Sequence, residues 1–482
     1  MACRLMLLLL SISLIRLTFD IPQVQASGTI YIRTDGSIDP PTISISTVDN
    51  ITYTFAGNIY DSIIIERDNI VVDGAGYTVY GGGDYGVCLS HRNNVTLKNI
   101  RIIDFICGIK LHNSTNNVLI GNTLSGNDLG IELYSSSDNT LINNTVSSST
   151  QYGIRLLHSN GNALFSNKAF STSIYGILLS YSCGNSLVDN DLSSNNDGIR
   201  VASSSDDNFL TRNKASNNVR GLHVCYSCGN GLVDNNVSDN EDGICLWSSS
   251  NNTLSGNNAL YNHNGIRLEA SSSNTISHNN LIGNAIQACS TVGYANTWDN
   301  GYPSGGNYWS DYIGIDVNHD GIGDIQREIN FDSVDHYPLM GMFHSFNISS
   351  GHYVNVISNC TIEDFQYFES EDRIEMQVSN SSVNQNYGFC RVCLPKDMFG
   401  PNCTVTIDAG ATETLYFSNA IHDTDTHAWV YFAYLNPIHQ LTIQTSSHQA
   451  GSFPTWTVIV IALMAVAVTI FLIYFIKVKK AT

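Results

Sequence analysis

Apolar and polar positions repeat with a fixed period between Asn94 and Asn279. The pattern Asn-x-Leu-x-x-Asn returns nine times, at steps of 22 or 23 residues, with Thr96 and Ile276 in place of Leu in the first and last copies. The first Asn of each copy is Asn94, Asn117, Asn139, Asn162, Asn185, Asn208, Asn230, Asn252 or Asn274. The second is Asn99, Asn122, Asn144, Asn167, Asn190, Asn213, Asn235, Asn257 or Asn279. A fixed period of this size is typical of a solenoid.

A column of glycines follows the same period: Gly86, Gly108, Gly130, Gly153, Gly176, Gly198, Gly221, Gly243 and Gly265. The residues one and three places after each Gly are mostly aliphatic, whereas the residue between them varies. This alternation predicts a strand, and the segments around the two asparagines predict two more short strands. Three strands in about 22 residues leave no room for a helix. The sequence therefore predicts an all-β fold, a three-sheet parallel β-helix over 84–290, which is right-handed because crossovers between parallel strands are right-handed.

Stacked coils place equivalent residues at the strand spacing of roughly 4.8 Å. We expect the asparagines to lie at corners, because Asn tolerates the left-handed conformation and its amide bonds to neighbouring backbone and to the next Asn. We expect the glycines to supply the second sharp bend. These roles are architectural and do not make a binding site.

The segments on either side of the repeat differ from it in pattern. Residues 27–83 are irregular but rich in β-formers, and we predict that they cap the first coil and form one or two coils themselves. Residues 291–342 are aromatic, acidic and glycine-rich, and we predict a C-terminal plug. Longer alternating runs separated by turns over 343–444 predict a small β-sandwich.

Both ends of the chain predict export to a membrane. Residues 1–26 have a basic start, an apolar run and a cleavage site at Ala26, as in a secretory signal, with an uncleaved anchor as the alternative. After a polar linker at 445–454, residues 455–476 contain no charge and are long enough to span a bilayer as a helix. The lysines that follow in the tail 477–482 place that tail in the cytoplasm. The prediction is a single-pass cell-membrane protein with a large extracellular part.

Amino-acid composition limits the classes of molecule that the protein could bind. Acidic residues outnumber basic ones 42 to 22, so nucleic acid is excluded as a partner. Only 13% of residues are charged, and Asn-x-Ser/Thr sequons, among them Asn50, Asn113, Asn236, Asn347 and Asn402, fit a glycosylated surface protein.

Twelve cysteines in an exported chain favour disulfides. Cys183 and Cys228 share one column but lie two coils apart, beyond the reach of a disulfide. Better candidates are Cys360, Cys390, Cys393 and Cys403, which allow three pairings. The Cys390-x-x-Cys393 pair is alternatively a zinc or redox motif.

The segment from Asp316 to Asp324 matches a calcium loop. Oxygen donors stand at positions 1, 3, 5 and 9 and glycine at position 6, with a backbone carbonyl at position 7. The predicted ligands are Asp316, Asn318, Asp320, Ile322 and Asp324. Position 12 departs from the pattern, because Arg327 stands where a carboxylate is expected, so Glu328, Asp311, Asp332 or Asp335 would have to replace it. The calcium would be structural; an ion-free acidic turn is the alternative.

Charged residues beside the glycine column are the candidates for catalysis. Asp197 precedes Gly198, Arg220 precedes Gly221, and Glu241 and Asp242 precede Gly243. On stacked coils, Asp197 and Asp242 would lie roughly 9.6 Å apart, at the upper end of the separation of about 6.5–9.5 Å in inverting glycosidases. The simpler interpretation is a ladder of charges on the solvent face.

The repeat and the plug resemble the NosD-like β-helix family, also described as carbohydrate-binding and sugar-hydrolase (CASH) repeats. The Asn-x-Leu-x-x-Asn coils, the run Gly306–Tyr312, the segment Asp316–Asp324 and Tyr337–Leu339 carry the resemblance. The segment after the plug looks like a β domain that follows such helices in archaeal surface proteins. The resemblance implies the fold and export, and the family name implies copper delivery. Copper sites need clustered His, Cys or Met, whereas the 14 histidines here are scattered, so copper is disfavoured.

Three classes of function remain. The sequence favours a non-catalytic surface protein that binds polysaccharide or cell-envelope glycan, or serves as a rigid structural component. The alternatives are a polysaccharide hydrolase, lyase or epimerase, and NosD-like copper delivery. The sequence specifies neither the ligand nor the oligomeric state.

Overall fold

The computed structural model describes residues 28–381, 385–399, 403–408, 411–413, 422–435 and 438–445. The predicted signal segment, the linker after Thr445, the predicted transmembrane segment and the tail lie outside these residues. None of the helices in the described ranges is long and apolar enough to cross a membrane. The chain divides into two compact units: unit 1 holds the described residues up to Asn252 and Arg267–Ala270, and unit 2 holds Thr253–Ile266 and those from Ser271 onward.

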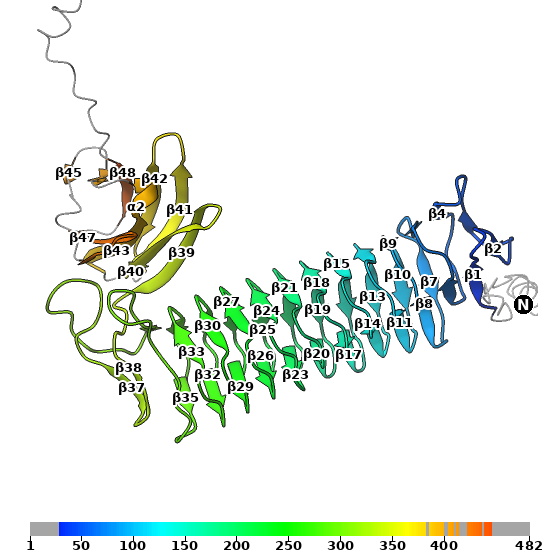
Figure 1. Cartoon of the computed structure of the whole chain (residues 1–482), viewed down its shortest axis with the longest axis horizontal. Helices are drawn as coiled ribbons and strands as arrows, with labels where there is room; N and C mark the ends of the chain where they lie inside the picture. The colour runs from blue at the N-terminus through cyan, green and yellow to red at the C-terminus, as the bar shows by residue number, and fades with distance from the viewer. Residues whose placement is uncertain are drawn as a thin grey trace, which may run out of the picture. The chain divides into compact units, whose positions relative to one another are not determined.

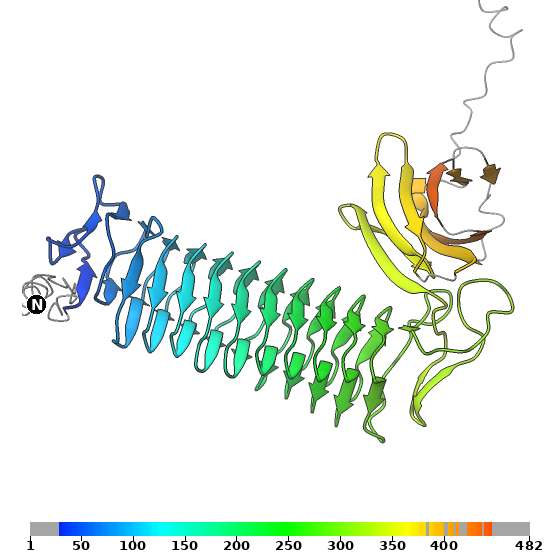
Figure 2. The same cartoon turned by 180° about the vertical axis from the view of Figure 1, so that it is seen from behind.

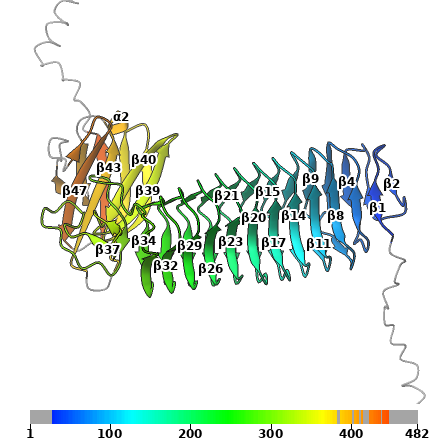
Figure 3. The ribbon, with the colours of Figure 1, turned by 60° about the horizontal axis from the view of Figure 1, so that its bottom comes forward.

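Unit 1 is a stack of coils, each contributing one strand to each of three sheets (Figures 1 and 3). Sheet A contains, in spatial order, β2 (Ile38–Asp39), β1 (Ile30–Ile32), β5 (Ile63–Ile65), β8 (Tyr85–Ser90), β11 (Cys107–His112), β14 (Leu129–Tyr134), β17 (Tyr152–Leu157), β20 (Tyr175–Ser180), β23 (Asp197–Ala202), β26 (Arg220–Cys225) and β29 (Asp242–Trp247). From β1 onward its strands are parallel, as β11 and β14 show. The predicted parallel β-helix is therefore confirmed.

Sheets B and C are built from shorter strands. Sheet B contains β3 (Ile45–Ser46), β4 (Thr52–Phe55), β6 (Ile70–Asp73), β9 (Val95–Lys98), β12 (Val118–Ile120), β15 (Thr140–Ile142), β18 (Ala163–Phe165), β21 (Ser186–Val188), β24 (Phe209–Thr211) and β27 (Gly231–Val233). Sheet C contains β7 (Thr78–Tyr80), β10 (Arg101–Ile103), β13 (Thr123–Ser125), β16 (Thr145–Ser147), β19 (Lys168–Phe170), β22 (Asp191–Ser193), β25 (Lys214–Ser216) and β28 (Asn236–Ser238). The inward aliphatic residues of all three sheets are buried, as Leu119, Leu124 and Ile131 show.

The asparagine columns form continuous buried ladders. Asn190 donates its side-chain amide to Leu164 O (3.0 Å) and Asn213 Oδ1 (2.9 Å), and Asn213 Oδ1 also accepts the backbone N–H of Asn190 (3.0 Å). Its own Oδ1 accepts the same two bonds from Asn167. A third column that the sequence analysis missed, including Asn195 and Asn218, bonds in the same way. Each coil is thus joined to the next by side-chain amides as well as by strand pairing.

Two details of the predicted asparagine repeat are wrong. In the first copy Val95 and Ile100, one residue beyond Asn94 and Asn99, occupy the ladder positions and donate their backbone N–H groups to Asn117 and Asn122. The ladder asparagines from Asn117 on do not take the left-handed conformation. The residue before each of them takes the left-handed conformation instead, as at Asn116 (φ 56°) and Gly121 (φ 65°).

The glycine column also has a different cause from the one predicted. None of these glycines has a positive φ. A Cβ at Gly130 would lie 2.4 Å from Gly153 O in the next coil and 2.3 Å from a methyl group of Val146. The column therefore requires Gly because the backbone of the next coil and the core approach too closely, and not because the chain bends there.

The N-terminal end of unit 1 is capped by short antiparallel pairs. β1 pairs with β2, and β3 pairs with β4, before the parallel coils begin. Figure 2 shows these strands in blue at the start of the stack. The predicted cap and first coils are present in this segment, since β5, β6 and β7 already pair in parallel with β8, β9 and β10.

Unit 2 begins with further coil strands: β30 (Thr253–Ser255) pairs with β33 (Thr275–Ser277), and β31 (Asn258–Leu260) pairs with β34 (Asn280–Ile282). β32 (Asn264–Glu269) crosses the division between the units, and β35 (Ile286–Ser290) follows. β36 (Tyr308–Trp309) pairs with β34, and Asn279 donates its side-chain amide to Asn307 (2.9 Å). The ladder therefore continues into the plug, where the sequence repeat is no longer visible.

The plug encloses large aromatic rings. Trp298 and Trp309 are buried, and Trp309 donates its indole N–H to Asp335 Oδ2 (2.9 Å). A short hairpin of β37 (Arg327–Asn330) and β38 (Ser333–Asp335) follows. These two tryptophans close a core.

The segment after the plug is a β-sandwich. One antiparallel sheet contains β39 (Met342–Ser349), β40 (His352–Ser358), β43 (Tyr387–Pro395), β47 (His427–Leu435) and β46 (His422–Asp423). The other contains β41 (Thr361–Phe368), β42 (Arg373–Ser379), β48 (His439–Thr445), β44 (Cys403–Ile407) and β45 (Ala411–Glu413), and the short α2 (Lys396–Phe399) follows β43. Residues of both sheets share one core that includes Val392 and Ile443.

Strand β43 carries the Cys-x-x-Cys motif. Cys390 lies in the sandwich core, whereas Cys393, three residues along the same strand, points to the opposite face. The two thiols therefore cannot hold one zinc ion or form one redox pair without breaking the strand. All cysteines in the described ranges have free thiols.

Strand β43 also contacts the plug. The buried side chain of Arg391 donates from Nη1 to Asp320 O (2.6 Å) and from Nη2 to Pro303 O (2.5 Å). Phe389 packs with Ile322 and Leu339 in a second small core. The sandwich and the plug of unit 2 are therefore packed together.

The asparagine ladder predicts a large and position-specific cost of substitution. Changing Asn190 to Leu leaves Leu164 O, Asn213 Oδ1 and two N–H donors of Asn167 without their hydrogen-bond partner. Because all of these groups are buried, we expect the free energy of unfolding to fall by about 3–5 kcal/mol. Thermal and urea unfolding of the purified protein measure this. The matched control is Asn196→Leu in the same coil, where the side chain is exposed. Equal stability of the two variants would contradict the structural role of the ladder.

Candidate functional site

The outer face of sheet A is the part of the repeat that departs most from its regular pattern. Its six-residue strands each point three side chains away from the core, at the first, fourth and sixth positions. In β20, β23, β26 and β29 these are Tyr175, Leu178 and Ser180; Asp197, Arg200 and Ala202; Arg220, His223 and Cys225; and Asp242, Cys245 and Trp247. Because the strands pair in register, these residues form three columns.

A buried carboxylate lies at the centre of this face. Asp197 is 0% exposed and has three cationic or polar neighbours. Arg220 Nη1 donates to Oδ1 (3.1 Å), Arg200 Nη1 donates to Oδ2 (3.2 Å), and His223 Nδ1 lies 2.9 Å from Oδ2. Burial opposes ionisation, but the hydrogen bond from His223 and the two arginine charges outweigh it and lower the pKa of Asp197. Asp197 is therefore ionised at neutral pH.

His223 is held as a neutral imidazole. It is 1% exposed, and its pKa is lowered by burial, with the charges of Arg200 and Arg220 adding to the effect against the hydrogen bond to Asp197. An ionised carboxylate only accepts hydrogen bonds, so Nδ1 must carry the proton that it donates to Asp197. Nε2 is then an unprotonated nitrogen, and it is a buried atom without a hydrogen-bond partner. The pair therefore presents a base that the fold itself does not use.

A row of basic side chains follows the same face. Arg220 Nε lies 3.8 Å from Asp242 Oδ2, and Arg267 Nη1 lies 3.5 Å from the same oxygen. Three coils before Asp197, Lys110 and Arg155 both pair with Glu132 at 3.2 Å. The acids of these pairs are almost fully buried, whereas the basic groups are about one quarter to one third exposed. The outward surface of the row is therefore cationic from Lys110 to Arg220, although the whole chain has a net charge of −20, whereas Arg267 also pairs with the partly exposed Glu269.

Aromatic rings line the edge where the strands of sheet A end. We call the set His91, His112, Tyr134, His158, Tyr181, Tyr226 and Trp247 the rim ladder. Successive rings contact one another from His91 to Tyr181, with centroid distances of 5.6, 5.4, 6.3 and 5.0 Å, and Tyr226 contacts Trp247 at 6.3 Å. Tyr226 is 59% exposed and Trp247 is 42% exposed. On the other side of the basic row, Tyr152 and Tyr175 stack at 5.4 Å.

The structure brings together three of the four sequence candidates for catalysis. Asp197, Arg220 and Asp242 form one chain of ion pairs, whereas Glu241 is exposed outside it. Asp197 and Asp242 form a charge ladder with Arg220 on the outer face of sheet A, in which both carboxylates are buried under the arginines.

The sequence analysis missed His223 and Arg200 as members of this group. Both occupy the position two residues after the column glycine, which the sequence analysis treated as freely variable. Comparing that position with the one before the glycine in the preceding coil would have placed His223 beside Asp197.

In the predicted calcium loop, carboxylate groups accept hydrogen bonds from backbone N–H groups of the loop itself. Asp316 accepts the backbone N–H groups of Asp320 (3.0 Å) and Gly321 (2.8 Å), and Asp324 Oδ2 accepts the backbone N–H of Val317 (2.6 Å). Arg327, the departure at position 12, pairs with Asp311 at 2.9 Å, so Asp311 is already neutralised.

One atom of the loop still favours a cation. Asp320 is 3% exposed, and its Oδ2 has no hydrogen bond, although Arg391 Nη1 lies 3.8 Å away. Within the described ranges, however, no three His, Cys, Asp or Glu side chains are grouped so as to hold a metal ion. Calcium binding at Asp316, Asn318, Asp320, Ile322 and Asp324 stays a prediction that would require the carboxylates to turn inward.

Two protein-family models match the repeat region. Residues 28–192 match the family model of the right handed beta helix region, and residues 157–314 match the model of the periplasmic copper-binding protein NosD. No curated protein matches the chain. Among solved structures, the A-module of the mannuronan C-5 epimerase AlgE6 from Azotobacter vinelandii has 15% identity and a TM-score of 0.42, over 56% of this chain and 89% of that one.

Two further structures match at a similar level. The periplasmic alginate epimerase AlgG has 17% identity and a TM-score of 0.38, over 52% of this chain and 68% of its own. A DFA-IIIase from Arthrobacter chlorophenolicus has 14% identity and a TM-score of 0.35, over 45% and 63%. Similarity this low does not transfer an activity. The two family models and the observed coils identify the repeat region as a right-handed parallel β-helix, part of which is similar to NosD.

Proposed function

We propose that the protein binds an acidic glycan outside the cell, along the outer face of sheet A. The observation that carries this proposal is the rim ladder, a row of exposed rings in contact along the stacking direction. Large exposed rings add nothing to the core of a soluble repeat, and aromatic faces bind the apolar C–H faces of sugars. A chain of sugar residues running along the coils would meet a ring at roughly every 4.8 Å of the stack from His91 to Tyr181, and again at Tyr226 and Trp247.

The row of basic side chains on sheet A predicts a preference for negatively charged glycans. The guanidinium groups of Arg200 and Arg220 are held by the buried carboxylate of Asp197 and keep N–H groups that these contacts leave for a ligand. Arg267 pairs with the buried Asp242 and also with the partly exposed Glu269. A fixed guanidinium fork matches a carboxylate or sulfate in two parallel hydrogen bonds. We therefore expect uronate or sulfated glycans to bind more tightly than neutral ones.

Catalysis on the same glycan is the second candidate function, and the Asp197–His223 pair favours it. A buried neutral imidazole with its Nε2 free and its Nδ1 held by a carboxylate has the arrangement of a general base. Tyr175 lies one coil before Asp197, and the ring faces the guanidinium of Arg200 at 5.0 Å. One observation disfavours catalysis. His223 Nε2 is buried in this conformation, so a substrate would have to displace the groups that cover this atom.

Anchoring at the membrane by residues 455–476, with the β-helix outside the cell, is part of this proposal. It rests on the charge-free segment and the lysines after it. An extracellular position is where a glycan-binding face would meet polysaccharide.

The rim ladder yields the first test of binding. The double change Tyr226→Ala and Trp247→Ala removes two exposed rings, and we expect the dissociation constant for a uronate oligosaccharide to rise about tenfold to a hundredfold, from roughly 0.5–1.5 kcal/mol per ring. A glycan array followed by calorimetry measures it. The control is Phe170→Ala, which removes an exposed ring from sheet C. Unchanged affinity in the double variant would refute the proposed surface.

Catalysis is tested on any glycan that the array identifies. In an enzyme, His223→Gln should abolish new reducing ends or unsaturated products and leave binding within about twofold, because Gln keeps a donor for Asp197. The rate should also persist below the usual pKa of histidine, since burial lowers the pKa of His223 and keeps the imidazole unprotonated there. Assays of the unaltered protein that give no product on a bound glycan would leave binding as the function.

Calcium at the Asp316–Asp324 loop is a separate proposal, supported by the buried Asp320 oxygen and by Gly321 with φ +84° at position 6. Calcium at about 100 times its dissociation constant should stabilise the folded protein by about 2.7 kcal/mol and raise the melting temperature. Calorimetry with calcium and with a chelator measures this, and Asp316→Asn should remove the response. An equal melting temperature in both conditions would exclude the site.

A further inference from the structure

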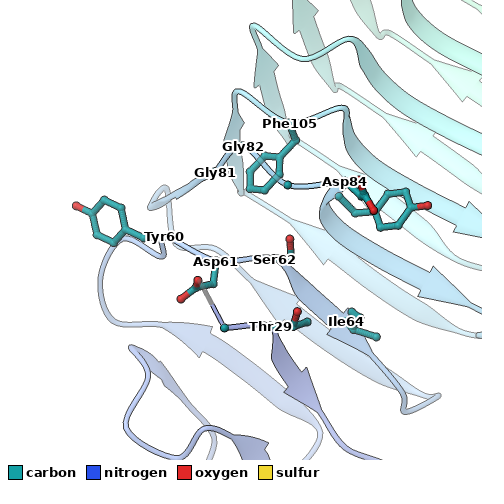
Figure 4. Close-up of a pocket in the computed structure, with 12 residues that line it drawn as sticks. Thr29, Tyr60, Asp61, Ser62, Ile64, Gly81, Gly82, Asp84 and Phe105 are labelled. Carbon is teal, nitrogen blue, oxygen red and sulfur yellow. The ribbon is translucent and has the colours of Figure 1, made fainter. Parts of the chain in front are cut away.

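A hollow of about 440 Å³ lies at the N-terminal end of unit 1, apart from the rim ladder and the basic row. Its walls come from three turns of chain: the segment before β1, the segment from Tyr60 into β5, and the segment from Gly81 into β8. Phe105, from the following coil, forms part of the floor and is buried. Figure 4 shows the residues that line it.

Three consecutive glycines keep this hollow open. A Cβ at Gly81 would lie 2.3 Å from the ring of Phe105, and a Cβ at Gly83 would lie 3.1 Å from Ser62 Oγ. A Cβ at Gly82 would meet no atom within 4 Å. Gly81 and Gly83 are therefore required by close packing, whereas Gly82 leaves a space that a side chain would fill.

Two carboxylates without partners line the hollow. Among the described residues, neither Asp61 nor Asp84 has a hydrogen-bond or ion-pair partner for its side chain, and no Lys or Arg lines the space. The two come from different turns of chain, with Ser62 between them in Figure 4. Other acids of unit 1, such as Asp197 and Glu132, are paired with arginine. The hollow is thus a locally anionic site.

Aromatic rings complete the lining. Tyr60 is 58% exposed and stacks on Tyr80 with a centroid distance of 5.5 Å. Tyr85 and Phe105 contribute two more rings to the wall. Rings near unpaired carboxylates favour a ligand that joins an apolar face to a positive charge, because the ring face and the carboxylates attract the cation and the ring packs against the apolar part.

From this juxtaposition we infer that the hollow binds a sugar residue that carries a protonated amine. The ammonium lies between Asp61 and Asp84, the ring of the sugar packs against the aromatic wall, and its hydroxyls reach Ser62, Thr29 and the open backbone of the glycines. The volume holds one or two sugar rings. A uronate is excluded, since its carboxylate would meet two unpaired acids.

The test compares probes that differ only in this charge. Calorimetry or ligand-observed NMR on the full-length protein uses a glucosamine tetramer, its N-acetylated counterpart and a tetralysine peptide, at about pH 5.5. We expect the glucosamine tetramer to bind and the acetylated one to bind at least tenfold more weakly. Added salt should weaken the binding.

The variants separate the site from general charge effects. Asp61→Asn and Asp84→Asn should each weaken the glucosamine tetramer about tenfold, and Gly82→Phe should abolish its binding by filling the hollow. Glu241→Gln is the matched control, because it removes one exposed negative charge elsewhere in unit 1 and should change nothing. The Tyr226→Ala, Trp247→Ala double variant should also bind the tetramer normally, so failure of the proposed glycan surface is distinguishable from failure of this site.

Three results would overturn the inference. They are equal or tighter binding of the acetylated tetramer, binding that neither Asp variant alters, and binding of tetralysine without binding of the glucosamine tetramer. Absence of binding by every probe would overturn it as well.

Discussion

The buried asparagine ladders are the constraint on which the rest of the structure depends. In the column of Asn190, the side-chain amide bonds to the backbone of the preceding coil and to the oxygen of the next amide, while its own oxygen accepts a backbone N–H. A slip of one residue between coils would leave these groups buried without partners, at a cost of about 1–3 kcal/mol for each. The same slip would also turn the buried aliphatic residues of each strand toward solvent. The ladders therefore fix which side chains become neighbours across coils.

Fixed register explains why charged residues far apart in sequence meet on sheet A. Asp197 receives Arg220 from the next coil and Arg200 from its own strand, and His223 completes the group from the next coil. Three donors offset the burial of one carboxylate, which would otherwise take up a proton. The same geometry turns the arginines outward, so that a chain with an excess of acids presents a cationic strip.

The sequence predicted the architecture well, because period and alternation are local features. It predicted the three sheets, the stacked asparagines and the sandwich from spacing alone. It placed Asn94 and Asn99 in the ladder, where the structure has Val95 and Ile100, since a one-residue shift leaves the spacing almost unchanged. It also gave Gly130 and its equivalents a turn, when their cause is the carbonyl of the next coil. Contacts of that kind exist only after stacking, so no local pattern reports them.

The candidate site was predicted less completely for the same reason. Asp197, Arg220 and Asp242 were found because they share one column, whereas His223 belongs to a different column and joins them only across a strand. The plug is a further case, because Asn307 extends the ladder through a segment whose period has changed from 22 to 28 residues.

The outward positions of sheet A are those where the fold demands least, and this makes their content informative. Leu178 shows that the position accepts an ordinary apolar residue, so nothing in the coil requires Arg200 or His223 in the neighbouring coils. Burying an ionised acid and leaving an imidazole nitrogen without a partner both cost free energy, and natural sequences retain such costs mainly where a ligand or a reaction benefits. Stability alone would favour neutral residues at the Asp197–His223 site, so ligand binding is the simpler explanation for its charges.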